Sequence, residues 1–194
     1  NLNTTVLEKT DYGEVPIDIF SKLSSNRILF LSSYIDSNLA TDISAALIYL
    51  DSMYDSVDDP KISIYINSDG ADTRSTFMLY DVMKTLRSPI ETFCTGHSCE
   101  LSTLILSSGT KGMRYATKNA VIMLSQLRHD DAFITTMTDS KKIMELFKKD
   151  NDSYIRAISK NVNKNMSVVR KKCLTNNYLE SKDALSYGLI DQII

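Results

Sequence analysis

Short strand patterns and longer helix patterns follow one another along this chain, and this alternation constrains the fold more than any other feature. Isoleucine occupies every second position from Ile62 to Ile66, which predicts a strand with one apolar face. The run from Asn67 to Gly70 ends that strand, and Asp72 opens the helix that follows as its capping residue. Strands followed by helices predict an α/β domain in which helices cover sheets.

The other expected elements fit the same architecture. A helix capped within Asp36 to Asn38 carries apolar residues every three or four positions through Met53, and a long helix is expected over Ser140 to Lys160. The helix opened by Asp72 stops at Ser88-Pro89. Further short strands are expected over Arg27 to Leu31, Ile90 to Thr95, Gly112 to Ala116 and Ala120 to Leu124.

Composition narrows the class of protein. A chain of 194 residues with 43% hydrophobic and 24% charged residues predicts one globular domain with a real core. The net charge of -2 provides no basic field for nucleic acid, and no apolar run reaches the roughly 18 residues that span a bilayer. Three cysteines without a CxxC pair indicate a reducing compartment, and neither a metal site nor a cofactor is expected.

Five segments of the chain, in order and at nearly the right separations, carry a family resemblance. They are Asp18–Leu23 with Arg27–Leu31, Tyr65–Gly70, Gly109–Tyr115, Asn119–Gln126, and Tyr178–Leu179 with Ala184–Asp191. In these segments the chain resembles ClpP, the proteolytic subunit of the Clp protease. The resemblance implies an α/β fold of the ClpP/crotonase type, a wedge of stacked strand-strand-helix units with a projecting handle helix. Residues 1–17 would be the axial-loop region and residues 18–194 the ClpP-like domain, with the handle over about residues 127–160.

The resemblance also assigns the three catalytic positions of the family, and none holds the family's residue. Glu100 stands at the nucleophilic serine, Ser125 at the histidine base and Asn176 at the orienting acid. A hydroxyl cannot accept a proton near neutral pH as an imidazole does, and an amide cannot stabilise an imidazolium by charge. Glu100 is expected at a helix start, where a carboxylate is favoured by roughly 0.3 to 1 kcal/mol. Its negative charge would then occupy the position where the family binds the oxyanion of the reaction intermediate.

The oxyanion turn of the family is degenerate as well. Its P-G-G sequence is Asp69-Gly70-Ala71 here, and Leu101 follows the nucleophile position. Because only glycine enters positive φ freely, Ala71 is expected to alter the turn. Together these departures narrow the resemblance to the catalytically inactive ClpR-type paralogues of plastids. They imply a noncatalytic subunit, not an enzyme, in an apicoplast-like plastid.

The resemblance also implies that this chain assembles with other protein subunits. Partners would be copies of this chain in a seven-membered ring, active ClpP subunits, and a Clp ATPase unfoldase. Tyr65 matches a tyrosine of the unfoldase-docking surface, although a strand tyrosine can equally serve packing. Thr175 replaces the arginine that reaches the opposite ring in the family, which predicts a single ring or a weak double ring.

A relocated active site is the rival hypothesis. Its nucleophile would be Ser98, Cys99 or Ser102, with His97 or His129 as the base. Each residue also has a structural interpretation, since serines beside a helix start commonly cap or pack. The carboxylates of Asp55, Asp58 and Asp59 lack the spacing of a calcium loop and are expected to be solvated. A crotonase-type acyl-CoA enzyme shares the superfold but matches these segments less closely.

Overall fold

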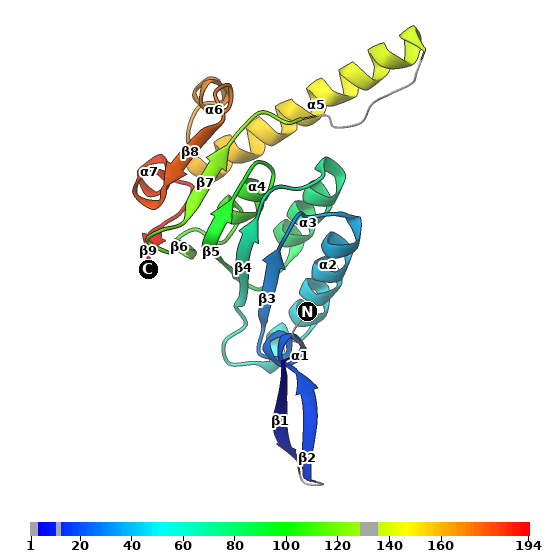
Figure 1. The fold of residues 1–194 in the computed structure, drawn as a ribbon, viewed down its shortest axis with the longest axis vertical. Helices are drawn as coiled ribbons and strands as arrows, with labels where there is room; N and C mark the ends of the chain where they lie inside the picture. Colours follow the sequence, from blue (N-terminus) through cyan, green and yellow to red (C-terminus); the bar gives the residue numbers. More distant parts are fainter. Residues whose placement is uncertain (1–3, 11–12, 129–135) are drawn as a thin grey trace.

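The computed structural model describes residues 4–10, 13–128 and 136–194 and has a sheet with helices packed on it (Figure 1). The strands are β1 (Thr5–Thr10), β2 (Gly13–Asp18), β3 (Ile28–Ser32), β4 (Ile62–Ser68), β5 (Ile90–Ser98), β6 (Arg114–Ala116), β7 (Val121–Leu124), β8 (Asn177–Glu180) and β9 (Gln192–Ile193). The helices are α1 (Ile19–Ser25), α2 (Ser37–Ser52), α3 (Thr73–Thr85), α4 (Ser102–Ser107), α5 (Met137–Val162), α6 (Met166–Cys173) and α7 (Ser181–Tyr187), with a 3₁₀ turn at Tyr54–Ser56.

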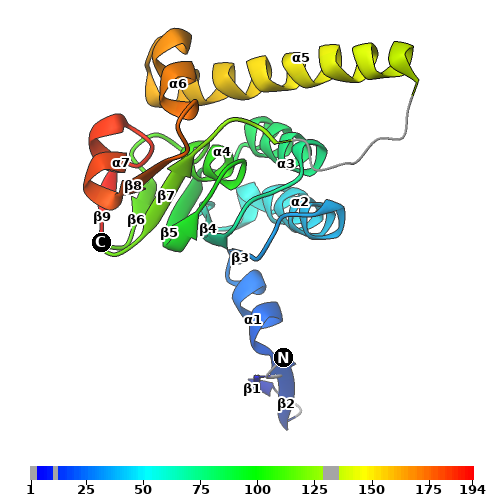
Figure 2. The ribbon, with the colours of Figure 1, turned by 45° about the horizontal axis from the view of Figure 1, so that its top comes forward.

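The main sheet has the strand order β3-β4-β5-β6-β9, and these neighbours are parallel. Strand β7 pairs in parallel with the end of β5 and antiparallel with β8. Helices α2, α3 and α4 lie together on one face of the sheet, and the long α5 extends beyond the body of the molecule (Figure 2). The predicted α/β fold with a projecting helix is therefore confirmed.

The helices begin where the sequence places their caps. The carboxylate of Asp36 accepts a hydrogen bond from the N–H of Leu39 at 2.8 Å, and that of Asp72 accepts one from Ser75 at 2.8 Å. Such a cap is worth about 1 kcal/mol, because it satisfies an N–H that has no partner within the helix. Helix α2 buries Ile43, and further apolar residues of α2 follow it at helical spacing. These residues form the side of the helix that packs against the sheet.

The face of the sheet opposite these helices carries a row of aromatic rings. Phe30, Tyr65, Phe93 and Tyr115 come from four successive strands, and their ring centroids stack 5.3, 4.7 and 4.7 Å apart. Tyr65 is half-buried in the middle of this aromatic row. Strand neighbours in register explain the row, since side chains of adjacent parallel strands lie side by side on one face.

Some boundaries differ from the predicted ones. Helix α5 begins at Met137 and ends at Val162, so it is longer than the expected Ser140–Lys160. The region expected as the axial loop contains the hairpin β1–β2, in which Val6 pairs with Ile17. Of the expected handle, residues 129–135 lie outside the part of the chain that the structure describes.

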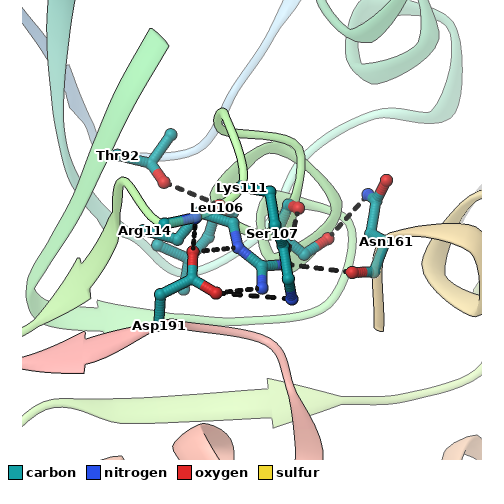
Figure 3. A network of polar contacts seen from close by, with 8 residues as sticks. Thr92, Leu106, Ser107, Lys111, Arg114, Asn161 and Asp191 are labelled. Carbon is teal, nitrogen blue, oxygen red and sulfur yellow. Dashed lines mark hydrogen bonds and ion pairs between the residues drawn. The ribbon is translucent and has the colours of Figure 1, made fainter. Parts of the chain in front are cut away.

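A buried arginine joins the end of the chain to the sheet and to two helix ends (Figure 3). The Arg114 side chain is 1% exposed, and its Nε and Nη2 donate to the two carboxylate oxygens of Asp191 at 2.8 and 2.7 Å. Its Nη1 donates to the carbonyl oxygens of Ser107 and Asn161, at the ends of α4 and α5. Burial by itself would raise the pKa of Asp191, but Arg114 and the N–H of Gly112 outweigh it and lower that pKa to about 2.

We predict that Asp191→Asn lowers the free energy of unfolding by about 3–5 kcal/mol, because it leaves a buried guanidinium without its counter-charge. Asp152→Asn is the matched control, since Asp152 pairs with Arg170 at the surface and such pairs are worth at most about 1 kcal/mol. Urea titrations of both variants measure the difference. Because the Asp191 pKa falls from 3.8 to about 2, its contribution is complete above about pH 4 and lost as the pH drops through 2. Equal stabilities of the two variants would contradict this role.

Candidate active-site position

The turn between β5 and α4 holds the position of the nucleophile. Glu100 lies in this turn with φ at 55°, a left-handed conformation that is rare for a residue with a side chain. The turn is fixed by its backbone, because the N–H of Cys99 donates to the carbonyl of Ser68 at 3.0 Å. Helix α4 begins at Ser102, two residues beyond Glu100, which is later than the sequence predicts.

Two further anchors hold the same turn. The Thr103 hydroxyl oxygen lies 2.8 Å from the carbonyl oxygens of both Ser98 and Met123 and can donate its single proton to either, which ties α4 to β5 and β7. The phenol of Tyr154, in α5, donates to the carbonyl oxygen of Glu100 at 3.4 Å. Tyr154 is completely buried, and this burial raises its pKa well above the ordinary value. The long helix therefore contacts the backbone of the turn directly.

The Glu100 carboxylate occupies the space in front of the oxyanion turn. Its Oε1 lies 3.2 Å from Nε of Arg128, and the Glu100 side chain is 23% exposed. Its Oε2 lies 3.2 Å from the point where a Cβ on Gly70 would stand. A negative charge thus sits beside the backbone that would have to stabilise the oxyanion of a reaction intermediate.

In the turn Asp69-Gly70-Ala71, positive φ is confined to Gly70, at 154°, and Ala71 has none. Ala71 is buried and forms a parallel bridge with Ile35. The demanding conformation therefore falls on the glycine, and the expectation that Ala71 alters the turn of the family stays a prediction. Leu101 is buried at the start of α4.

The positions of the base and the acid lie beside each other at one end of the sheet. Strand pairing places Leu124 opposite Asn177, so their chain neighbours Ser125 and Asn176 lie next to one another. Ser125 is 1% exposed, and its hydroxyl has no hydrogen-bond partner among the described residues. Asn176 is exposed in the turn before β8, with φ at 37°. Neither Ser125 nor Asn176 can act as a general base near neutral pH.

A cleft of about 460 Å³ opens in front of Glu100. Its apolar wall includes Leu101, Leu127 and Phe147. Two ion pairs border it, one between Glu100 and Arg128 and one between Arg74 of α3 and Asp150 of α5. The sequence analysis assigned no role to Arg128, Tyr154 or the Arg74–Asp150 pair. Only the strand register of β7, which sets the direction of the chain after Leu124, could have placed Arg128 near the turn.

The two serines of the relocated-site hypothesis are buried and hydrogen-bonded within the protein. Ser98 and Ser102 are fully buried, with their hydroxyl oxygens 3.2 Å apart. The Ser102 hydroxyl donates to the carbonyl oxygen of Cys99 at 2.7 Å. Burial raises the pKa of the Cys99 thiol, and the charges of Asp69 and Glu100 add to the effect. A raised pKa disfavours the thiolate that a nucleophilic Cys99 would need.

His97, the histidine candidate within the described residues, does not complete a catalytic pair with either serine. Nε2 of His97 lies 2.7 Å from Oδ1 of Asp69, an ion-pair distance without the alignment of a hydrogen bond. In the described part of the chain, no histidine is hydrogen-bonded to Ser98 or Ser102. His129 lies outside the described residues.

The acidic residues before β4 are paired or exposed. Asp55 pairs with Arg87 at 2.9 Å, Asp59 pairs with Lys61 at 3.3 Å, and Asp58 is exposed. Within residues 4–10, 13–128 and 136–194, no group of three or more acidic, histidine or cysteine side chains is placed to hold a metal ion. The helices in these ranges also include none with the length and apolar character needed to cross a bilayer.

We predict that Cys99 reacts slowly with iodoacetamide at pH 7, since a thiol whose pKa lies above 9.0 is less than about 1% thiolate there. The rate should keep rising as the pH passes 9, and mass spectrometry of the alkylated protein measures it. Cys94 and Cys173 are buried, each with a pKa raised to about 12, and should react only after unfolding. Cys99→Ser is the control that removes the label. Rapid labelling that is already maximal at pH 7 would contradict the raised pKa.

Comparison with known families agrees with this architecture. The family described as Clp protease matches residues 11–194, which includes the turn, the oxyanion backbone and the long helix. That family consists of serine proteases whose subunits typically assemble into rings. Because the match extends over almost the whole chain, this protein belongs to the Clp protease family.

Proposed function

We propose that this chain is a noncatalytic, ring-forming subunit of a Clp-type ATP-dependent protease complex, of the inactive ClpR type. The observation that carries the proposal is the Glu100 carboxylate, which is paired with Arg128 where the family has its serine hydroxyl. An oxyanion would have to develop beside this negative charge, which raises the energy of the transition state instead of lowering it.

The neighbouring positions support the same proposal. Ser125 offers a buried hydroxyl where a general base is needed, and Asn176 offers a neutral amide. Catalytic groups of this kind act as a unit, so a partial site retains little activity. The cleft and its backbone remain while the proton relay is missing, as is typical of a subunit kept for assembly.

Assembly is supported by the surface that the sheet leaves uncovered by helices. The aromatic row of Phe30, Tyr65, Phe93 and Tyr115 lies on that surface, and Tyr178 of β8 is 69% exposed. A continuous row of aromatic side chains on a protein surface is commonly buried in a protein interface. We infer rings with copies of this chain or with active ClpP subunits, docking of an ATPase unfoldase, and a plastid location.

Covalent labelling tests the lack of catalysis. A fluorophosphonate should form no adduct with the purified protein, and fluorogenic peptides should not be hydrolysed above the background rate, because no described hydroxyl is activated by an imidazole. An active Clp proteolytic subunit assayed in parallel is the positive control. An adduct that disappears in Ser98→Ala or Ser102→Ala, together with turnover that disappears with it, would instead establish a relocated site.

Native mass spectrometry tests the assembly. We predict a seven-membered ring at low micromolar concentration, because Thr175 cannot make the charged contact of the arginine that it replaces. Thr175→Arg is the informative variant: it should shift the population towards fourteen-subunit particles if the missing cation limits ring stacking. A stable fourteen-subunit particle of the unmodified protein at this concentration would contradict the prediction.

A further inference from the structure

A second cavity of about 680 Å³ lies at the ends of α3, α4 and α5 and shares no lining residue with the cleft at Glu100. Five cationic side chains line it: Lys84, Arg87, Lys111, Arg114 and Lys160. Among the described residues, no aspartate or glutamate belongs to its lining. Hydroxyl and amide donors complete the wall, among them Ser88, Thr110 and Asn163. The cavity is therefore rich in hydrogen-bond donors and in positive charge.

The nearby carboxylates do not neutralise this charge. Asp191 pairs with both Arg114 and Lys111, and Asp55 pairs with Arg87. Lys84 donates to a neutral group, the carbonyl oxygen of Ser108 at 2.8 Å. Lys160 forms no ion pair within the described part of the chain. Asp51 accepts hydrogen bonds from the N–H groups of Arg87 and Ser88, and the nearby Arg27 offsets its charge. With Arg87 neutralised by Asp55, the other four cations of the lining face one carboxylate, that of Asp191.

The negative ends of the helix dipoles offset only part of the excess positive charge in the cavity. Cations are favoured at helix C-termini, and each terminus carries about half a negative charge. Three termini meet here, so they offset roughly half of the three uncompensated positive charges. Partial burial lowers the pKa of Lys84, and the like charges of Lys160 and Arg114 lower it further. Lys84 is thus repelled by these two neighbouring cations, and an anion in the cavity would relieve this repulsion.

We propose that this cavity binds a small anion that carries a chain of phosphates, free or attached to a nucleoside. Lysine, arginine, hydroxyl and amide donors together are the groups that recognise phosphate oxygens. The volume is within the usual range for small-molecule sites and exceeds the needs of a single phosphate. Met83, Leu86 and Pro89 provide an apolar side of the cavity, against which a base could pack. This proposal is independent of the lack of catalysis.

The geometry of the cavity indicates which side chains would contact the ligand. Arg114 is held by Asp191 and by two carbonyl oxygens, and Lys111 also lies beside Asp191 (Figure 3). Lys84 and Lys160 are the cations without a carboxylate partner. We therefore expect these two lysines to make the main contacts with a bound anion. Arg114 and Lys111, which are held by Asp191, are expected to keep the wall of the cavity in place.

Calorimetric titration of the purified protein with tripolyphosphate, ATP and orthophosphate, at constant ionic strength near 0.15 M, tests the proposal. Tripolyphosphate should bind saturably and more tightly than orthophosphate. Lys84→Gln and Lys160→Gln should each weaken it by about tenfold, the loss of one charge-assisted contact. Lys182→Gln, at an exposed lysine of α7 outside the cavity, should leave the affinity unchanged. Tighter binding of ATP than of tripolyphosphate would identify a nucleoside ligand, and equal affinity would identify the phosphate chain alone.

Thermal denaturation of the unmodified protein provides a second measurement that needs no variant. Tripolyphosphate should raise the midpoint temperature, and the increase should shrink as salt is added, because screening weakens the attraction. Absence of saturable binding would overturn the proposal. So would equal losses of affinity in Lys84→Gln and Lys182→Gln, since that result indicates nonspecific attraction to a positive surface.

Discussion

The ion pair between Arg114 and Asp191 is the contact on which the positions of the other site elements depend. It joins β6 to the last turn of the chain, and the third arm of the guanidinium holds the carbonyl oxygens of Ser107 and Asn161. Those carbonyls end α4, which follows the Glu100 turn, and lie in the last turn of α5, which supplies Tyr154. A buried guanidinium needs every donor satisfied, so this one group fixes how two helices meet the sheet.

At the cleft, the contacts that hold the backbone are separate from the side chains at the catalytic positions. This separation makes the proposed noncatalytic subunit physically reasonable. The turn is anchored by backbone groups and by Thr103, none of which depends on the identity of residue 100. The side chains at positions 100 and 176 face solvent or the cleft, so replacing them removes little from the core. Position 125 differs because Ser125 is buried with an unpartnered hydroxyl, a local cost of about 1–3 kcal/mol. The residues at these positions can therefore change with little effect on the fold.

Features governed by local pattern could be predicted from the sequence. Strand β4, the caps of α2 and α3, and the strand-helix alternation follow from periodicity and capping chemistry, which act within a few residues. The hairpin β1–β2 was not predicted, because its pairing of Val6 with Ile17 has no turn motif to mark it. The pairing of Glu100 with Arg128 joins residues whose proximity depends on the strand register, and local patterns do not encode it. The sequence also does not say which residue of the turn takes positive φ, and the structure places it on Gly70 and not on Ala71.

The ion pair at the cleft is too weak to explain why the turn keeps its strained shape. Arg128 is more than half exposed in its pair with Glu100, and such pairs are typically worth less than about 1 kcal/mol. A left-handed conformation at a residue with a side chain costs roughly 1–2 kcal/mol. The strain at Glu100 is therefore borne by the backbone frame, through the Cys99 N–H, the Thr103 hydroxyl and the Tyr154 phenol. The same frame packs α4 and α5 on the sheet, and this packing sets the shape of the surface around the cleft.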